Sequence, residues 1–259
     1  MDNTSLGDRI KMYENVERKY LTRRLPTIIR VDGEHFHSYT RGFDRPFDLG
    51  FLAAMQQTAK QLCENIMGAK IAYTQSDEIT ILLRDDDTLV TQAWFDKNLQ
   101  KIVSTAASMA TYFFNKNIAR LYAQGLPSTI PYDWLHASDG VKKAYSEGRL
   151  AIFDARAFIV PPEEVMNVFE WRQQDCIRNS IQMIARAHFS HKELIGVSCA
   201  DMQTKLLDEK NVNVENYDVY LRRGSCVVKD ASGHWVIDTH IPIFHEEPTY
   251  VVVERHESL

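Results

Sequence analysis

Residues Ile71–Leu83 read I-A-Y-T-Q-S-D-E-I-T-I-L-L. Two apolar runs that are rich in strand-forming residues, Ile71–Thr74 and Ile79–Leu83, flank a polar tetrapeptide. This pattern is typical of an antiparallel hairpin in which the tetrapeptide Gln75–Glu78 forms the tip. Polar side chains at such a tip are well exposed, so the hairpin can present them to a ligand.

The strands and helices predicted on either side of this hairpin follow the order of a known fold. Leu25–Val31 reads L-P-T-I-I-R-V and predicts a buried strand. Apolar residues at three- and four-residue spacing within Leu52–Ile66 predict a helix that Asp48 would cap, and Gln92–Tyr122 predicts a long core helix. Ala151–Val160 then predicts another strand. The order β-α-β-β-α-β indicates an α+β fold of the ferredoxin-like type.

The remaining segments have weaker patterns. Residues Gly125–Gly148 contain prolines and little periodicity, which predicts a loop or an insertion. Glu163–Phe189 has a helical pattern, and Val197–Leu207 predicts a shorter helix. Strand-like runs follow around Tyr217–Tyr220, Cys226–Val228, Trp235–Ile237 and Tyr250–Val253. The chain therefore ends in a helical and mixed extension.

The composition describes an ordinary globular protein and excludes several classes. Of the 259 residues, 44% are hydrophobic and 25% are charged. No apolar run approaches the roughly 20 residues that a membrane-spanning helix needs. The segment Met1–Gly7 lacks the features of an export signal. We therefore expect a cytoplasmic protein that does not enter a membrane.

The cysteines predict neither a zinc site nor a redox centre. No two of them form a C-x-x-C pair, so buried free thiols are expected. The four positions are Cys63, Cys176, Cys199 and Cys226.

Charge is segregated along the chain although its net value is only −5. Residues Arg9–Arg24 hold six basic and two acidic residues, and Trp171–Lys192 holds four basic and one acidic. Each run alone fits a solvated helix face, whereas the two together leave a surface for a polyanion open. The chain has no glycine-rich phosphate-binding motif, so a bound nucleotide would be held by metal and basic side chains.

Two acids lie where strands of the predicted sheet end or turn. Asp32 closes the first strand, and Asp77 lies in the hairpin between the second and third. The first and third strands are neighbours in a ferredoxin-like sheet, so both carboxylates can converge at one edge. Such pairs suit Mg²⁺, and two Mg²⁺ ions favour phosphoryl transfer. The alternative is that Asp32-Gly33 is a turn and that Asp77 makes only local hydrogen bonds.

Four motifs in this order resemble the tRNA(His) guanylyltransferase superfamily, across about residues 9–225. They are R-V-D-G-E-H-F-H at Arg30–His37, Y-T-Q-S-D-E-I at Tyr73–Ile79, F-D-A-R-A-F at Phe153–Phe158 and W-R-Q-Q-D-C-I-R-N-S at Trp171–Ser180. The resemblance implies one catalytic unit over residues 1–259, with a polymerase-like palm at about 9–160. Residues at about 161–259 would contribute tRNA contacts.

The resemblance also implies a reaction. Nucleotides would be added in the 3′-to-5′ direction to the 5′ end of a tRNA. ATP or GTP would first activate the 5′-monophosphate as a nucleotidyl intermediate, which the 3′-hydroxyl of the incoming nucleotide would attack. Positioning and charge neutralisation suffice for such phosphoryl transfer, so a general-base histidine is not required. A homotetramer is typical of the family.

By the same resemblance, Asp32, the Gly33 carbonyl and Asp77 would hold two Mg²⁺ ions. The nucleotide would also contact Glu34, His35, Phe36, His37, Arg45 and Ser76. We expect His35 and His37 to share one face of an extended segment, with Phe36 on the other. Contacts to tRNA would come from Arg172, Arg178, Asn179, Arg222 and Arg223. Trp171, Asp175 and Arg178 share one face of the predicted helix, so the alternative there is a helix salt bridge beside a structural Trp171.

One departure bears on the substrate. Eukaryotic enzymes dedicated to adding the extra guanylate of tRNA(His) carry H-I-N-N, whereas this chain reads Ile177-Arg178-Asn179-Ser180. The chain is more similar to the bacterial and archaeal guanylyltransferase-like branch, which implies template-dependent repair of truncated tRNA 5′ ends. The alternatives are guanylate addition to tRNA(His), a nucleotide cyclase on a related palm, and a non-catalytic RNA-binding module.

Overall fold

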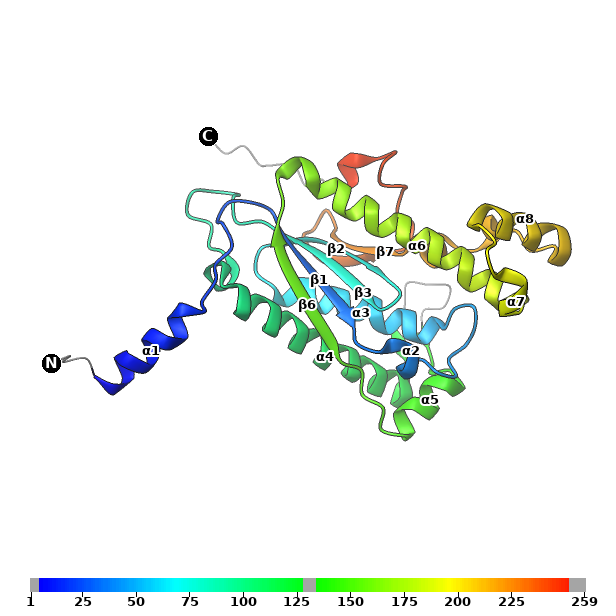
Figure 1. Ribbon diagram of the computed structural model, residues 1–259, viewed down its shortest axis with the longest axis horizontal. Coiled ribbons are helices and arrows are strands. Elements are labelled where there is room, and N and C mark those ends of the chain that lie inside the picture. The colour runs from blue at the N-terminus through cyan, green and yellow to red at the C-terminus, as the bar shows by residue number, and fades with distance from the viewer. Residues whose placement is uncertain (1–4, 128–133, 252–259) are drawn as a thin grey trace.

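A six-stranded antiparallel sheet organises the chain in the computed structural model, which describes residues 5–127 and 134–251 (Figure 1). The strand order is β6-β1-β3-β2-β7-β8, and β4 and β5 form a separate pair. The strands are β1 Thr27–Gly33, β2 Ala69–Gln75, β3 Glu78–Leu83, β4 Leu126–Pro127, β5 Trp134–Leu135, β6 Phe153–Ile159, β7 Ser225–Lys229 and β8 Trp235–Asp238.

Helices cover both faces of this sheet. The α-helices are α1 Leu6–Val16, α2 Phe36–Tyr39, α3 Leu49–Asn65, α4 Leu99–Gln124, α5 Asp139–Ser146, α6 Val165–His188, α7 His191–Leu194, α8 Cys199–Lys210 and α9 Val219–Arg223. The 3₁₀ turns are η1 Trp94–Lys97, η2 Pro162–Glu164, η3 Val214–Asn216 and η4 Pro248–Tyr250. None of the helices in the described ranges is long and apolar enough to cross a membrane.

The predicted α+β fold is confirmed. The elements β1, α3, β2, β3, α4 and β6 follow one another as β-α-β-β-α-β, and their strands lie side by side as β6-β1-β3-β2. This is the ferredoxin-like arrangement. The sheet continues through β7 and β8, which come from the C-terminal extension. Two of the strand-like runs predicted there are therefore part of the main sheet.

The core has two layers because each face of the sheet packs against helices. On one face α3 and α4 cover a large apolar cluster that includes Ile29 and Phe114, both fully buried. On the other face α6 covers a second cluster, which includes Ile28 and Phe169. Every residue of β3 is buried, since both of its faces are covered. The predicted hairpin is thus the centre of the sheet.

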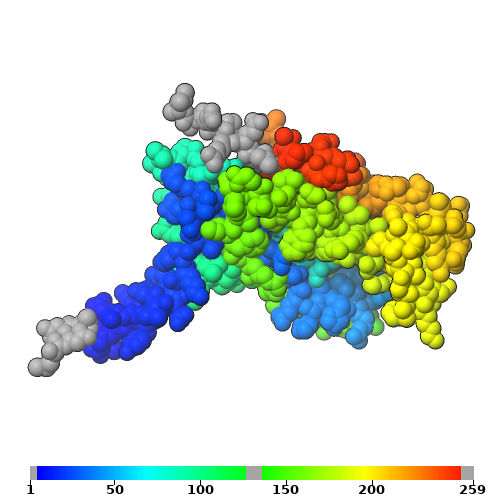
Figure 2. Space-filling model, turned by 45° about the horizontal axis from the view of Figure 1, so that its top comes forward, coloured from blue at the N-terminus to red at the C-terminus, as the bar shows by residue number. Residues whose placement is uncertain are grey.

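The ends of the molecule differ from this core. At one end α1 projects from the body, and none of its residues is buried (Figure 1). At the other end α7 and α8 extend beyond the sheet, where they pack on the last turns of α6 (Figure 2).

The long helix begins later than its apolar periodicity predicts, at Leu99 rather than Gln92. Residues Phe95, Asp96 and Lys97 all have left-handed backbone conformations, with φ of 48°, 54° and 63°. Such a turn cannot continue into a right-handed helix. Asn98 then caps the helix by accepting a hydrogen bond from the Lys101 amide at 3.0 Å.

Three other predictions of secondary structure are wrong. The predicted loop Gly125–Gly148 contains α5, which Ser138 caps by accepting from the Val141 amide at 3.2 Å; its residues 128–133 lie outside the described part. The strand predicted at Tyr217–Tyr220 is instead the approach to α9, because a run this short fits both periods. At Tyr250 the chain forms a 3₁₀ turn, and residues 252–253 lie outside the described part.

Candidate active site

Asp32 and Asp77 lie close together at one end of the strands, where β1 ends and the β2–β3 hairpin turns; we call this end the sheet edge. Asp32 lies near the end of β1 and pairs in register with Glu78 of β3. The Gly33 amide donates a hydrogen bond to the Asp77 carbonyl at 3.1 Å, which fixes the hairpin tip against the end of β1. Asp32 belongs to β1, and Asp77 lies in the turn just before the neighbouring strand β3, as the sheet order predicts.

Their proximity has an electrostatic consequence. The pKa of Asp77 is raised above its ordinary value because burial disfavours the carboxylate, and the negative charge of Asp32 adds to this effect. A hydrogen bond from the Ser76 hydroxyl to Asp77 Oδ1, at 3.0 Å, partly opposes it. A cation bound between the two carboxylates would relieve this repulsion.

Glycine is required at position 33. A Cβ atom there would lie 2.3 Å from the ring of Phe36, which is itself buried in the core. The close approach of this ring lets the chain turn directly from β1 into α2. The same turn brings residues 34–37 beside Asp32.

The segment after Gly33 is not extended, so that prediction is wrong. His35 has a left-handed conformation with φ of 53°, and residues Phe36–Tyr39 form one helical turn. The rings of His35 and His37 nevertheless lie near each other, with centroids 6.0 Å apart, and Phe36 points into the core.

Most of the predicted nucleotide-binding residues line one of two pockets, whereas Asp32 and Gly33 line neither of them. One pocket, of about 410 Å³, is lined by Phe36, His37, Arg45, Ser76 and Asp77. The other, of about 570 Å³, contains Glu34 and His35. The first also contains Arg186 of α6, and the second Arg41 and Arg149, none of which the sequence singled out. The first pocket therefore offers positive charge beside Asp77, whereas Arg149 in the second pocket already pairs with Glu147.

Asp48 shapes the wall of the first pocket. Its carboxylate accepts hydrogen bonds from the Phe51 amide at 2.9 Å, the Asp44 amide at 3.2 Å and the Ser138 hydroxyl at 2.5 Å. It thus caps α3, as predicted, and also ties down the loop that carries Arg45. The cap holds Arg45 in the pocket lining.

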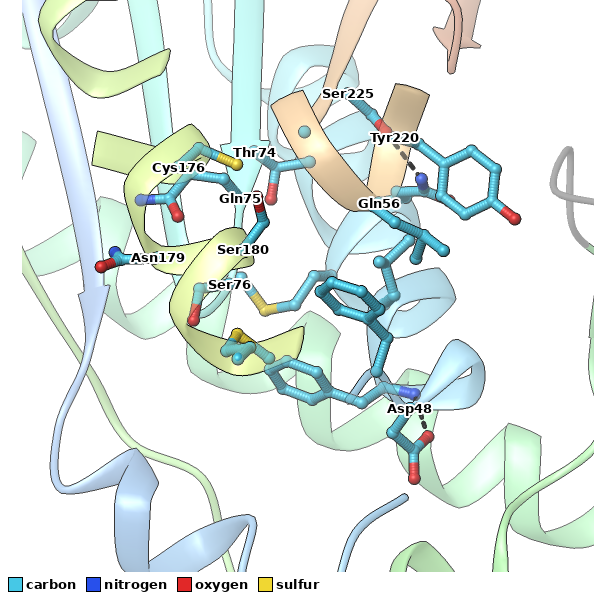
Figure 3. A pocket seen from close by; sticks show the side chains of 17 residues that line it. Asp48, Gln56, Thr74, Gln75, Ser76, Cys176, Asn179, Ser180, Tyr220 and Ser225 are labelled. Atoms are coloured by element: carbon cyan, nitrogen blue, oxygen red, sulfur yellow. Dashed lines mark hydrogen bonds between the residues drawn. The ribbon is translucent and has the colours of Figure 1, made fainter. Parts of the chain in front are cut away.

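A third, smaller pocket of about 80 Å³ lies behind Ser76, between α3, α6 and α9 (Figure 3). Asn179 and Cys176 of α6 line one side of it. On the other side the buried Gln56 donates a hydrogen bond to Ser225 Oγ at 2.8 Å (Figure 3). Of the predicted tRNA contacts, only Asn179 lines this space.

The predicted tRNA contacts do not form one surface. The Arg172 side chain is 10% exposed and donates to Glu78 Oε1 at 2.7 Å and to Asp175 Oδ2 at 2.9 Å. Arg178 is exposed and pairs with the same Asp175 at 2.7 Å. The structure therefore shows the helix salt bridge that was the alternative to a tRNA contact. It leaves the Arg172 guanidinium little room for a phosphate.

The other two predicted contacts lie on α9, below α6. Arg222 forms an ion pair with Glu215 and donates to the Tyr217 carbonyl at 2.7 Å. Arg223 is partly buried, and its Nε atom has no hydrogen-bond partner. Both line a small pocket beside α6 and not the sheet edge.

Asp32 belongs to a row of charged residues on the α6 face of the sheet, and sequence reasoning did not assign a role to the others. Asp154, Asp32 and Glu78 are directly opposite one another on β6, β1 and β3. Two residues further along the strands, and so on the same face, Arg156 is opposite Arg30. The alternation D-x-R in β6 could have indicated them, because residues two apart share a face of a strand.

The donor set at this edge fits Mg²⁺. It consists of the carboxylates of Asp32 and Asp77, and Gly33, whose carbonyl is the third predicted ligand, is hydrogen-bonded to Asp77 through its amide. Within residues 5–127 and 134–251 there is no cluster of three or more histidine, cysteine, aspartate or glutamate side chains that could hold a metal alone. Mg²⁺ is commonly bound by one or two carboxylates together with substrate phosphates, so such a cluster is not needed.

Comparisons with known proteins agree with this geometry. A family model described as tRNAHis guanylyltransferase matches residues 7–161. A bacterial tRNA(His) guanylyltransferase-like protein in complex with ATP is 44% identical, with a TM-score of 0.83 over 96% of this chain and 97% of that chain. A bacterial protein of the same description in complex with GTP is 40% identical, with a TM-score of 0.77 over 96% and 98%.

A curated relative gives the same result. The tRNA(His) guanylyltransferase of Debaryomyces hansenii is 28% identical over 216 residues, which cover 78% of this chain and 73% of the relative. The family match includes both acids of the sheet edge, and the structural matches extend through the C-terminal helices. The chain therefore belongs to the tRNA(His) guanylyltransferase family.

Proposed function

We propose that this protein is a Mg²⁺-dependent 3′-to-5′ nucleotidyltransferase that repairs truncated tRNA 5′ ends by templated addition. The observation that carries the proposal is the meeting of Asp32 and Asp77 beside a pocket lined by Arg45 and Arg186. Two acids and a basic pocket are what phosphoryl transfer from a nucleoside triphosphate needs. The similarity to bacterial proteins in complex with ATP and with GTP supports both nucleotides as substrates.

In this proposal the side chains position reactants and balance charge. Asp32, Asp77 and the Gly33 carbonyl would hold two Mg²⁺ ions, which would stabilise the attacking and leaving oxygens. Arg45, His37 and Arg186 would bind the triphosphate in the pocket that they line. Ser76 would orient Asp77 through the hydrogen bond between their side chains. Glu34 and His35 would contact a nucleotide from the adjoining pocket.

Repair is favoured over guanylate addition to tRNA(His) by the side chain at position 177. Ile177 stands where the dedicated enzymes carry the histidine of H-I-N-N, and it packs against the apolar cluster between α6 and α8. An apolar side chain there cannot offer a hydrogen bond to a tRNA. We further propose a homotetramer that acts on tRNA in the cytoplasm, with Arg178 and Asn179 exposed to the RNA.

The test is an extension assay with two substrates. Purified protein, Mg²⁺, ATP and all four nucleoside triphosphates are incubated with a 5′-truncated tRNA or with intact tRNA(His), each 5′-monophosphorylated. We expect only the truncated tRNA to be extended, with nucleotides complementary to its 3′ strand. Asp77→Ala should abolish extension, whereas Asp139→Ala should not, because the Asp139 side chain is fully exposed on α5.

The other outcomes separate the alternatives. Addition of guanylate to tRNA(His) alone would assign the protein to the dedicated branch. Formation of a cyclic nucleotide without RNA would indicate a cyclase. If tRNA is bound but neither substrate is extended, the protein is an RNA-binding module and the proposal is wrong.

A further inference from the structure

Two arginines face each other on the open part of the α6 face of the sheet. Arg30 of β1 and Arg156 of β6 are directly opposite in register, so their side chains share that face. Like charges in such a pair repel each other and destabilise a sheet unless anions lie between them. The surroundings of each guanidinium therefore show whether its charge is already satisfied.

Arg30 is poorly satisfied. Its nearest carboxylate oxygen belongs to Glu78, at 4.0 Å, which is beyond hydrogen-bond distance. Glu78 already accepts a hydrogen bond from Arg172 at 2.7 Å. The Nε atom of Arg30 is buried and has no hydrogen-bond partner. A buried donor of this kind is rare and indicates that a partner is missing.

Arg156 is loosely held and accessible. Its guanidinium lies 3.6 Å from Asp32 and 3.5 Å from Asp154, so neither contact is a close hydrogen bond. Its side chain is 51% exposed. If Asp32 binds a metal ion, as the proposed function requires, Arg156 loses part of this pairing. It is then free to hold another anion next to the metal.

An aromatic side chain borders Arg30. Trp171 of α6 is half exposed. The centre of its ring lies 5.6 Å from the Arg30 guanidinium and 4.4 Å from the Arg172 guanidinium, so the part of the ring left exposed is what a base could cover. Exposed aromatic rings beside cationic side chains provide stacking surfaces for nucleic-acid bases. None of β6, Arg30 or Trp171 contributes to the pocket that contains Arg45. This surface is therefore separate from the pocket assigned to the nucleoside triphosphate.

We propose that Arg30 and Arg156 form a phosphate site for the 5′ end of the RNA, with Trp171 stacking on its terminal base. The site would place the 5′-phosphate beside Asp32, where the proposed reaction needs it. The inference rests on the proposed function for the identity of the RNA. The phosphate site itself follows from the Arg30 Nε atom, which has no hydrogen-bond partner, and from the exposed Arg156.

The test measures binding without turnover. A short RNA duplex with a 3′ overhang is labelled away from its 5′ end and titrated with protein by fluorescence anisotropy, in Mg²⁺ and without nucleotide. We expect the 5′-monophosphorylated duplex to bind about tenfold more tightly than the 5′-hydroxyl duplex, because a phosphate gains charge-assisted hydrogen bonds. Arg156→Gln should abolish this preference, and Arg156→Lys should keep part of it.

Controls and a second ligand separate the possible sources of phosphate. Arg120→Gln, an exposed arginine on α4, should leave the preference unchanged. ATP affinity, measured by calorimetry, should be the same for wild type and Arg156→Gln. If Arg156→Gln weakens ATP but not the phosphorylated duplex, the site belongs to the nucleotide and the assignment to RNA is overturned. Equal binding of both duplexes by the wild type would overturn it as well.

These results do not depend on catalysis. A 5′-phosphate preference that Arg156→Gln removes would support the phosphate site even if no tRNA is extended. In that case only the proposed repair reaction would fail. Melting temperatures of all variants verify that the sheet remains folded.

Discussion

Replacing Arg172 by methionine tests the ion pair that joins α6 to β3. The Arg172 and Glu78 side chains are only 10% and 8% exposed, and Nε donates to Oε1 at 2.7 Å. Methionine fills similar space but leaves Glu78 buried without its partner. Burial raises the pKa of Glu78, and Arg172 opposes that shift, so the pKa of Glu78 should rise further in the variant.

The expected cost follows from this burial. Removing one partner of a buried ion pair destabilises a protein by about 3–5 kcal/mol. For a chain of this size that corresponds to a fall in Tm of about 6–20 °C. The deficit should shrink as the pH falls, because protonation of Glu78 removes the unpaired charge. As the pH rises through the raised pKa, the full deficit should return.

Thermal and urea denaturation of Arg172→Met are the assays, with Arg178→Met as the matched control. Arg178 pairs with Asp175 at 2.7 Å but its side chain is 61% exposed, so its loss should cost less than about 1 kcal/mol. The double variant Arg172→Met with Glu78→Gln should recover part of the lost stability, since no buried charge remains. Equal Tm values for the two single variants would refute the argument.

Three further predictions concern single side chains. Asp77→Asn should abolish extension. Without metal it should also raise Tm at neutral pH, because the raised pKa of Asp77 means that the ionised carboxylate destabilises the folded protein as the pH rises; scanning calorimetry in EDTA measures this. Asp48→Ala should lower the free energy of unfolding by about 1–2 kcal/mol, measured in urea, because α3 loses its cap, and should weaken ATP binding. Burial raises the pKa of Cys176 to about 12, so a thiol reagent at pH 8 should label the less buried Cys199 first, as peptide mass spectrometry would show.

Local patterns predicted the elements whose identity depends on neighbouring residues in the chain. The strands of the hairpin and β1 are rich in β-branched residues and bounded by polar ones. Helix α3 has both its periodicity and its Asp48 cap. The elements that were missed are short or unusual. The left-handed turn at Phe95–Lys97 is made without glycine, and α5 and α9 have too few residues to establish a period.

From the order of elements alone it follows that Asp32 and Asp77 come together, because in this fold the first and third strands are neighbours. The sequence also indicated a family through motifs that are contiguous in the chain. Which charged side chains are buried in ion pairs and which stay accessible depends on how distant segments pack. Arg172 and Glu78 are 94 positions apart, and they pair because α6 lies across β3. Arg156 remains accessible because it lies on β6, the edge strand of the sheet. Burial depends on contacts between distant segments, and no local spacing encodes it.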